Sequence, residues 1–284
     1  MGIDSTSKNE VLNMKKIYFI EGIPGAGKSS LMNTFSDNQF AVLHYEHNIN
    51  TLIDVTRKAF LTKEQYDDFI KNITPLCIQI YGSDDFLYGI NKIKKNTCSW
   101  RNYKIVALES LGFSNQLLNN MVSQLSNYEI TFKRIELEKY VHLLIELFDS
   151  YFSSKSFNQI HVFEGALLQN ILLDLIAAYE LDDFQIIEIY KRLIPMDLKK
   201  MMVVQIIKVD DISNVINRAA KERNKNTPLW IDSFINYVEQ SPYGKTHHLS
   251  GMEGVVLFCE KLQNTMLKIC REDLFDFIII NRKE

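Results

Sequence analysis

The sequence lacks the features that mark several classes of protein. Its four cysteines form no Cys-x-x-Cys pair, and no histidine lies at a metal-ligand spacing from them. We therefore interpret them as reduced core residues rather than as a disulfide framework or a zinc module. Positive charge is not in excess, because 32 Lys and Arg stand against 35 Asp and Glu, for a net charge of −3. A nucleic-acid polymer is not an expected partner.

Long apolar runs are also missing. No run approaches the roughly 20 residues of a membrane-spanning helix, and residues 1–16 lack the apolar core of a signal peptide. Met1-Gly2 with Thr6 matches a short myristoylation pattern, but a flexible leader over residues 1–15 is the preferred interpretation. We expect a cytoplasmic protein that makes no membrane contact. With 46% hydrophobic and 24% charged residues in 284, the chain is long enough to bury a core.

Short, continuous apolar runs are present instead, and each of them predicts a buried strand. Segments with helical spacing separate the runs, a pattern that predicts a parallel sheet covered on both faces. We therefore expect an α/β fold with a doubly wound, five-stranded parallel sheet. After the second run, residues 50–158 are expected to form a helical insertion, in which 103–108 is either a strand or the start of a helix. The predicted strands are 16–21, 40–45, 160–163, 201–209 and 275–280.

One motif carries specific chemistry. Residues 22–29, GIPGAGKS, match the phosphate-binding pattern G-x-x-x-x-G-K-[ST], and an apolar strand leads in while a helix leads out. The glycines let successive backbone N–H groups point at phosphate oxygens. Lys28 is expected to face solvent beside the phosphates, and Ser29 to bind Mg²⁺. The predicted nucleotide-binding residues are Gly22, Gly25, Ala26, Gly27, Lys28, Ser29 and Ser30.

Acidic residues follow several of the predicted strands. Ligands of parallel α/β sheets lie outside the carboxyl ends of the strands, so these acids are candidates for the chemistry. Glu46, after the second strand, is the candidate general base for an acceptor hydroxyl. Glu164, after the third, is the candidate acid that holds Mg²⁺ with Ser29. Glu109, after the run 103–108, is a lower-ranked choice for the same role.

A basic segment follows the fourth strand. Arg218, Lys221 and Arg223 lie on a predicted helix, within a region of about 211–228 that could close over a triphosphate. Arg218 and Arg223 would then stabilise charge that develops on the transferring phosphoryl group. The alternative is a solvated helix, in which Glu222 offsets part of the charge.

The segments FIEGIPGAGKSS, HYEHN, VFEG and NRAAKER together resemble the P-loop kinases of nucleosides and nucleoside monophosphates, the thymidylate kinase and deoxynucleoside kinase group. The resemblance implies a P-loop NTPase fold over residues 16–284, an acid after the second strand that acts as base or substrate contact, and lid arginines after the fourth. Deoxynucleoside kinases carry an Arg after the acid of the third strand, whereas this chain has Gly165. The segments EGALLQN and SPYGKTHHLSGMEG resemble an uncharacterised thymidylate-kinase-like branch.

The expected activity is therefore an ATP- and Mg²⁺-dependent kinase that phosphorylates a small metabolite, with a nucleoside or nucleotide as the leading acceptor. Gln169 and Asn170 are candidate hydrogen-bond readers of that acceptor, unless they cap a helix. Two alternatives stay open: an antibiotic-modifying phosphotransferase, and an ATPase or nucleotide-switch module that acts on a protein partner. The sequence also leaves open a homodimer and the choice between ATP and GTP.

Overall fold

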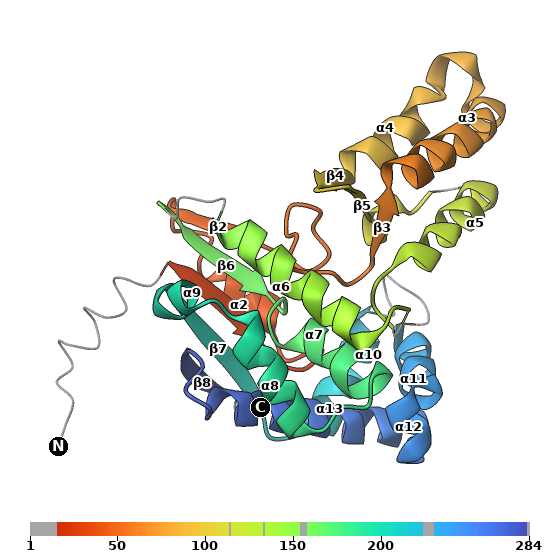
Figure 1. The fold of residues 1–284 in the computed structure, drawn as a ribbon. Helices are drawn as coiled ribbons and strands as arrows, with labels where there is room; N and C mark the ends of the chain where they lie inside the picture. The colour runs from red at the N-terminus through yellow and green to blue at the C-terminus, as the bar shows by residue number, and fades with distance from the viewer. Residues whose placement is uncertain (1–15, 114, 133, 154–157, 224–229, 283–284) are drawn as a thin grey trace, which may run out of the picture. The chain divides into compact units, whose positions relative to one another are not determined.

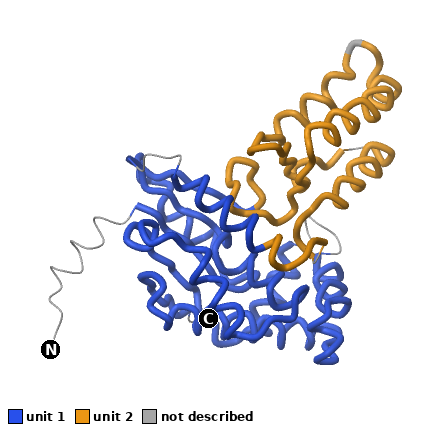
Figure 2. Tube along the Cα trace, in the orientation of Figure 1, with its two compact units in different colours: residues 1–46, 141–284 blue, residues 47–140 orange. Residues whose placement is uncertain are grey.

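The chain divides into two compact units, residues 1–46 with 141–284 and residues 47–140 (Figure 2). A computed structural model describes residues 16–113, 115–132, 134–153, 158–223 and 230–282. The predicted leader over residues 1–15 lies outside the described residues. The second unit occupies most of the region that the sequence assigns to an insertion.

The first unit is built on a five-stranded sheet in which every pair of neighbouring strands is parallel. The strand order is β2-β6-β1-β7-β8, so the strand that leads into the phosphate-binding motif is central. Runs such as IYFIE in β1 and MVVQIIKV in β7 are mostly buried, as expected for central strands of a parallel sheet. The predicted five-stranded parallel sheet is confirmed. Its strands are β1 (Ile17–Glu21), β2 (Ala41–His44), β6 (Ile160–Glu164), β7 (Met202–Val209) and β8 (Asp276–Arg282). The edge strand β8, however, is mostly exposed, so the prediction that every strand is buried is wrong there.

Helices flank this sheet (Figure 1). Asp182 caps α8 by accepting from the Gln185 backbone N–H group, and Ser241 caps α12 in the same way. None of the helices in the described ranges is long and apolar enough to cross a membrane. The helices are α2 (Lys28–Asn33), α6 (Leu137–Ser153), α7 (Gln169–Leu172), the π-helix η3 (Leu173–Ala178), α8 (Asp183–Leu193), α9 (Met196–Met201), α10 (Ile212–Arg223), α11 (Trp230–Gln240), α12 (Pro242–Thr246) and α13 (Gly251–Cys270).

The second unit contains a three-stranded antiparallel sheet of order β3-β5-β4, which the prediction of a helical insertion missed. The ambiguous run 103–108 is a strand, because its residues pair with neighbours on both sides. Helices α3, α4 and α5 pack on a core that includes Ile73, Ile93 and Leu118. The elements are β3 (Lys58–Thr62), α3 (Lys63–Asp85), α4 (Leu87–Lys95), β4 (Thr97–Trp100), β5 (Tyr103–Ala107), the 3₁₀ helix η1 (Glu109–Leu111), α5 (Gln116–Gln124) and the 3₁₀ helix η2 (Leu125–Tyr128).

All four cysteines lie in the described part of the chain and are free thiols. Cys77, Cys259 and Cys270 are buried, and Cys98 is half-buried. Burial raises the pKa of the Cys270 thiol to about 12, with a further contribution from the charge of Glu21. Because the thiolate is the reactive form, such a group is inert. The three buried thiols fit the predicted role of small core residues.

Candidate functional site

The phosphate-binding motif, residues 22–29, forms the turn between the central strand β1 and helix α2. We call this turn the phosphate loop. Gly25 adopts a φ of 83°, and a Cβ atom there would lie only 2.6 Å from the Cβ of Ala219 on α10. Both the left-handed backbone and this close approach require glycine. The loop is therefore packed directly against the helix that carries the basic cluster.

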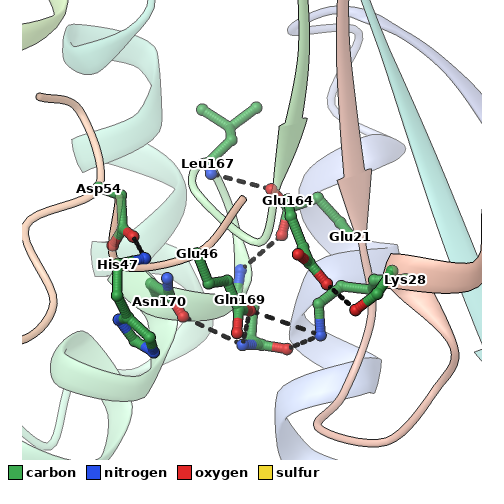
Figure 3. Close-up of polar contacts among 10 residues, drawn as sticks. Glu21, Lys28, Glu46, His47, Asp54, Glu164, Leu167, Gln169 and Asn170 are labelled. Carbon is green, nitrogen blue, oxygen red and sulfur yellow. Dashed lines mark hydrogen bonds and ion pairs between the residues drawn. The ribbon is translucent and has the colours of Figure 1, made fainter. Parts of the chain in front are cut away.

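Lys28 is buried at the first position of α2, not solvent-facing as the sequence suggested. Its Nζ atom donates to Oε1 of Gln169 at 2.5 Å and lies 3.6 Å from Oε1 of Glu46 (Figure 3). The carboxyl ends of neighbouring parallel strands meet at one edge of the sheet, which brings these groups together. The lysine charge is thus already engaged by side chains of the protein itself.

Ser29 and Glu164 form the second contact of the phosphate loop. The Ser29 hydroxyl donates to Oε1 of Glu164 at 2.5 Å, and Glu164 is a buried residue at the end of β6. Glu109 instead lies in η1 of the second unit, where it is exposed and 3.6 Å from Arg57. Glu164 thus lies beside Ser29, as the sequence prediction of a shared site requires.

Glu46 lies two residues beyond the end of β2, and its side chain is 17% exposed. Its Oε1 atom accepts from Nε2 of Gln169 at 2.9 Å. Gly165 has a φ of 63°, and a Cβ atom there would overlap the same oxygen of Glu46. The glycine that departs from the deoxynucleoside kinase pattern therefore makes room for the candidate base.

Gln169 and Asn170 begin helix α7, and both side chains are buried. Neither is the N-cap of that helix, because Leu168 occupies the cap position. The Gln169 Nε2 atom also donates to Oδ1 of Asn170 at 3.0 Å. The alternative that both residues cap a helix is wrong, and their side chains belong to the polar cluster around Lys28.

Glu21, the last residue of β1, is a part of the site that sequence reasoning missed. It is fully buried, and its two oxygens accept from the backbone N–H groups of Leu167 and Gln169, each at 2.8 Å (Figure 3). Burial raises the pKa of Glu21 to about 7, against the lowering effect of these N–H groups and of the Lys28 charge. An acid at the end of an otherwise apolar strand, directly before the glycines, was the available signal.

The basic helix α10 is only partly arranged as predicted. The Nη2 atom of Arg218 is buried and has no hydrogen-bond partner among the residues that the structure describes. Arg223 is exposed, and its guanidinium lies over the ring of Trp230, 4.6 Å from the centroid. The remainder of the predicted lid, residues 224–228, lies outside the described residues. Arg218 therefore has a donor that none of the described residues uses, whereas Arg223 already packs on an aromatic ring.

Arg282, at the end of β8, is a second contact that sequence reasoning missed. Its Nη1 atom donates to the backbone carbonyl oxygen of Ala26 at 2.6 Å, within the phosphate loop. The predicted site residues at strand ends are acids, and the predicted cations lie on the helix after the fourth strand, so none of them is at the end of the last strand. The same strand-end rule would have found it.

Comparisons with known proteins identify no relative of this chain. No protein-family model matches the chain, and neither the curated proteins nor the solved structures contain a significant match. Function must therefore be inferred from the phosphate loop, three strand-end acids, a buried amide and an arginine nitrogen that has no partner among the described residues.

Proposed function

We propose that this chain is an ATP- and Mg²⁺-dependent kinase that transfers the γ-phosphoryl group to a small acceptor, with a nucleoside or nucleotide as the leading class. The observation that carries the proposal is the meeting of the phosphate-loop lysine and the candidate base, whose Lys28 Nζ and Glu46 Oε1 atoms are 3.6 Å apart. The five-stranded parallel sheet with the phosphate loop after its central strand is compatible with a P-loop fold.

The donor side is supported by the chemistry of the phosphate loop. Its backbone N–H groups and the Lys28 ammonium are donors for phosphate oxygens. Ser29 and Glu164, already in contact at 2.5 Å, would hold a magnesium ion together with water and phosphate oxygens. Such an ion, when bound, would offset the negative charge of the phosphate oxygens. The donor set thus fits a magnesium–triphosphate complex.

The acceptor side is supported by Glu46. Its carboxylate would take the proton of an acceptor hydroxyl while the acceptor oxygen bonds to the γ-phosphorus and the bond from that phosphorus to its bridging oxygen breaks. A phosphate acceptor would need no base, and Glu46 would then orient the acceptor. The short distance from Glu46 to Lys28 would place the base beside the group being transferred.

Arg218 is the proposed source of additional positive charge. A buried guanidinium N–H group without a partner is costly, and a phosphate oxygen would satisfy it. Its helix α10 packs against the phosphate loop at Gly25. This proximity supports a role at the triphosphate, and it assigns Arg218 more weight than Arg223.

The proposal is tested by measuring ATP consumption and product formation with Mg²⁺ against a panel of nucleosides, nucleoside monophosphates and aminoglycosides. We expect phosphorylated product with at least one nucleoside or nucleotide. Product with an aminoglycoside alone would assign the antibiotic-modifying alternative. ATP hydrolysis without any phosphorylated acceptor would assign an ATPase or switch module. No binding of ATP with Mg²⁺ in direct calorimetry would overturn the whole assignment.

A further inference from the structure

Gln169 makes contacts that neither the phosphate loop nor the candidate base requires by itself. Its Oε1 atom accepts from Lys28 at 2.5 Å, and its Nε2 atom donates to Glu46 at 2.9 Å. A side-chain amide has one acceptor end and one donor end. Here the acceptor end meets the ammonium donor of Lys28, and the donor end meets the carboxylate acceptor of Glu46. The two charged groups of the proposed reaction are thus joined through one neutral, buried side chain.

The backbone of Gln169 is fixed independently of its side chain. Its N–H group donates to Oε2 of Glu21, while the N–H group of Leu167 donates to Oε1 of the same acid. The carbonyl oxygen of Leu167 also accepts from the hydroxyl of Tyr190 at 2.8 Å. The turn after β6 is therefore held from two sides by buried groups, so the amide is presented in one place.

We propose that Gln169 is a positioning residue of the phosphoryl-transfer site. Its amide oxygen holds the Lys28 ammonium in place until a triphosphate binds to that ammonium. Its amide nitrogen fixes the Glu46 carboxylate beside the acceptor. This inference rests on the proposed kinase function and deepens it. The triphosphate oxygens compete with Gln169 Oε1 for the same ammonium, because Lys28 is buried and already engaged. Nucleotide binding releases one end of the amide, and the other end stays on Glu46.

If the inference is right, only one of two substitutions at Gln169 weakens nucleotide binding. Gln169→Leu removes the competitor for Lys28 at similar size, so the Kd for ATP with Mg²⁺ should stay within about threefold of wild type or fall below it. The same variant loses the hold on Glu46, so transfer should slow by about 10²-fold, the usual effect of a misplaced group. Gln169→Glu keeps an acceptor for Lys28 but adds negative charge, so the Kd should rise by about tenfold or more.

Gln263 offers a matched control. It is another buried glutamine of the same unit, 5% exposed like Gln169, and its side chain also makes hydrogen bonds with both amide ends, here to the backbone of Val209. Gln263→Leu should therefore have a thermal-stability cost similar to that of Gln169→Leu. It should not reproduce the combination of slow transfer and undiminished nucleotide affinity.

The experiment is calorimetric titration of each purified full-length variant with ATP and Mg²⁺, followed by the acceptor panel. A Kd that stays within about threefold of wild type or falls in Gln169→Leu, and rises by about tenfold or more in Gln169→Glu, with slow transfer in the first variant, would support the inference. Weaker binding in both variants, in proportion to their loss of stability, would reduce Gln169 to a structural residue and leave the kinase assignment standing. Absence of ATP binding by the wild type would overturn the assignment and the inference together.

Discussion

The buried carboxyl group of Glu21 gives a prediction whose magnitude follows from the structure. Burial raises the pKa of Glu21 from its usual 4.5 to about 7 in the folded protein, although two backbone N–H groups and the Lys28 charge act in the opposite direction. Tyr190 and Cys270 are the other titratable groups that interact with it, and burial raises the pKa of both. Between pH 4.5 and 7, Glu21 is therefore protonated in the folded chain but ionised in the unfolded one.

A group whose pKa is higher in the folded state contributes its full stability below the unfolded value, and loses it as the pH rises through the folded value. For Glu21 this window runs from about pH 4.5 to about 7. A difference of roughly 2.5 pKa units corresponds to about 3 kcal/mol of unfolding free energy. The wild type should lose about 2.5 kcal/mol from this single group between pH 5 and 8, because part of the contribution is already lost at pH 5.

Glu21→Gln removes the titration and keeps the size of the side chain. Urea unfolding of wild type and variant, followed by circular dichroism at pH 5, 6, 7 and 8, should show the variant gaining about 2.5 kcal/mol relative to wild type across the series. Glu260→Gln, at an exposed position on α13, should show no comparable trend. A constant difference between Glu21→Gln and wild type at every pH would refute the reasoning, because it would mean that Glu21 stays ionised when buried.

Three further predictions concern the proposed reaction. Lys28→Ala should lower ATP turnover by about 10²-fold or more, which corresponds to a loss of roughly 3 kcal/mol of transition-state stabilisation. The far-ultraviolet circular dichroism spectrum should stay unchanged. Near wild-type turnover would show that Lys28 has no role in the reaction. Glu46→Gln should slow transfer to a hydroxyl acceptor by about 10²–10⁴-fold. With a phosphate acceptor, the same variant should show mainly a higher KM for that acceptor. Unchanged kcat and KM would exclude Glu46 both as a base and as an acceptor contact. Arg218→Ala should lower kcat more than it weakens ATP binding. Arg223→Ala should have the smaller effect on kcat, because the guanidinium of Arg223 packs on the Trp230 ring. A larger effect of Arg223→Ala on kcat would contradict the assignment of Arg218.

The parts of the molecule that local sequence determines were predictable. The strands of the parallel sheet are continuous apolar runs, and the phosphate loop is a contiguous motif. The strands β3 and β4 were missed because four or five residues of mixed polarity carry little periodic signal, and their pairing with β5 supplies the stabilisation.

The connections inside the site were harder to predict, because they join residues far apart in the chain. The rule of strand ends located Glu46 and Glu164, but it could not show that Gln169 would lie between Lys28 and Glu46. The buried ammonium group of Lys28 donates to that amide, which lies 141 residues away in sequence. Long-range polar contacts of this kind carry no local pattern.

The glycine at position 165 ties the identity of two distant positions together. Any side chain there would occupy the space of the Glu46 carboxylate, and the left-handed backbone would strain it in addition. A single substitution that introduces an arginine after Glu164 would therefore displace the acid at 46 instead of adding a cation beside it. In any lineage of this chain, residues 46 and 165 should change as a pair. Laboratory evolution that replaces one of them for a different acceptor would have to replace the other as well.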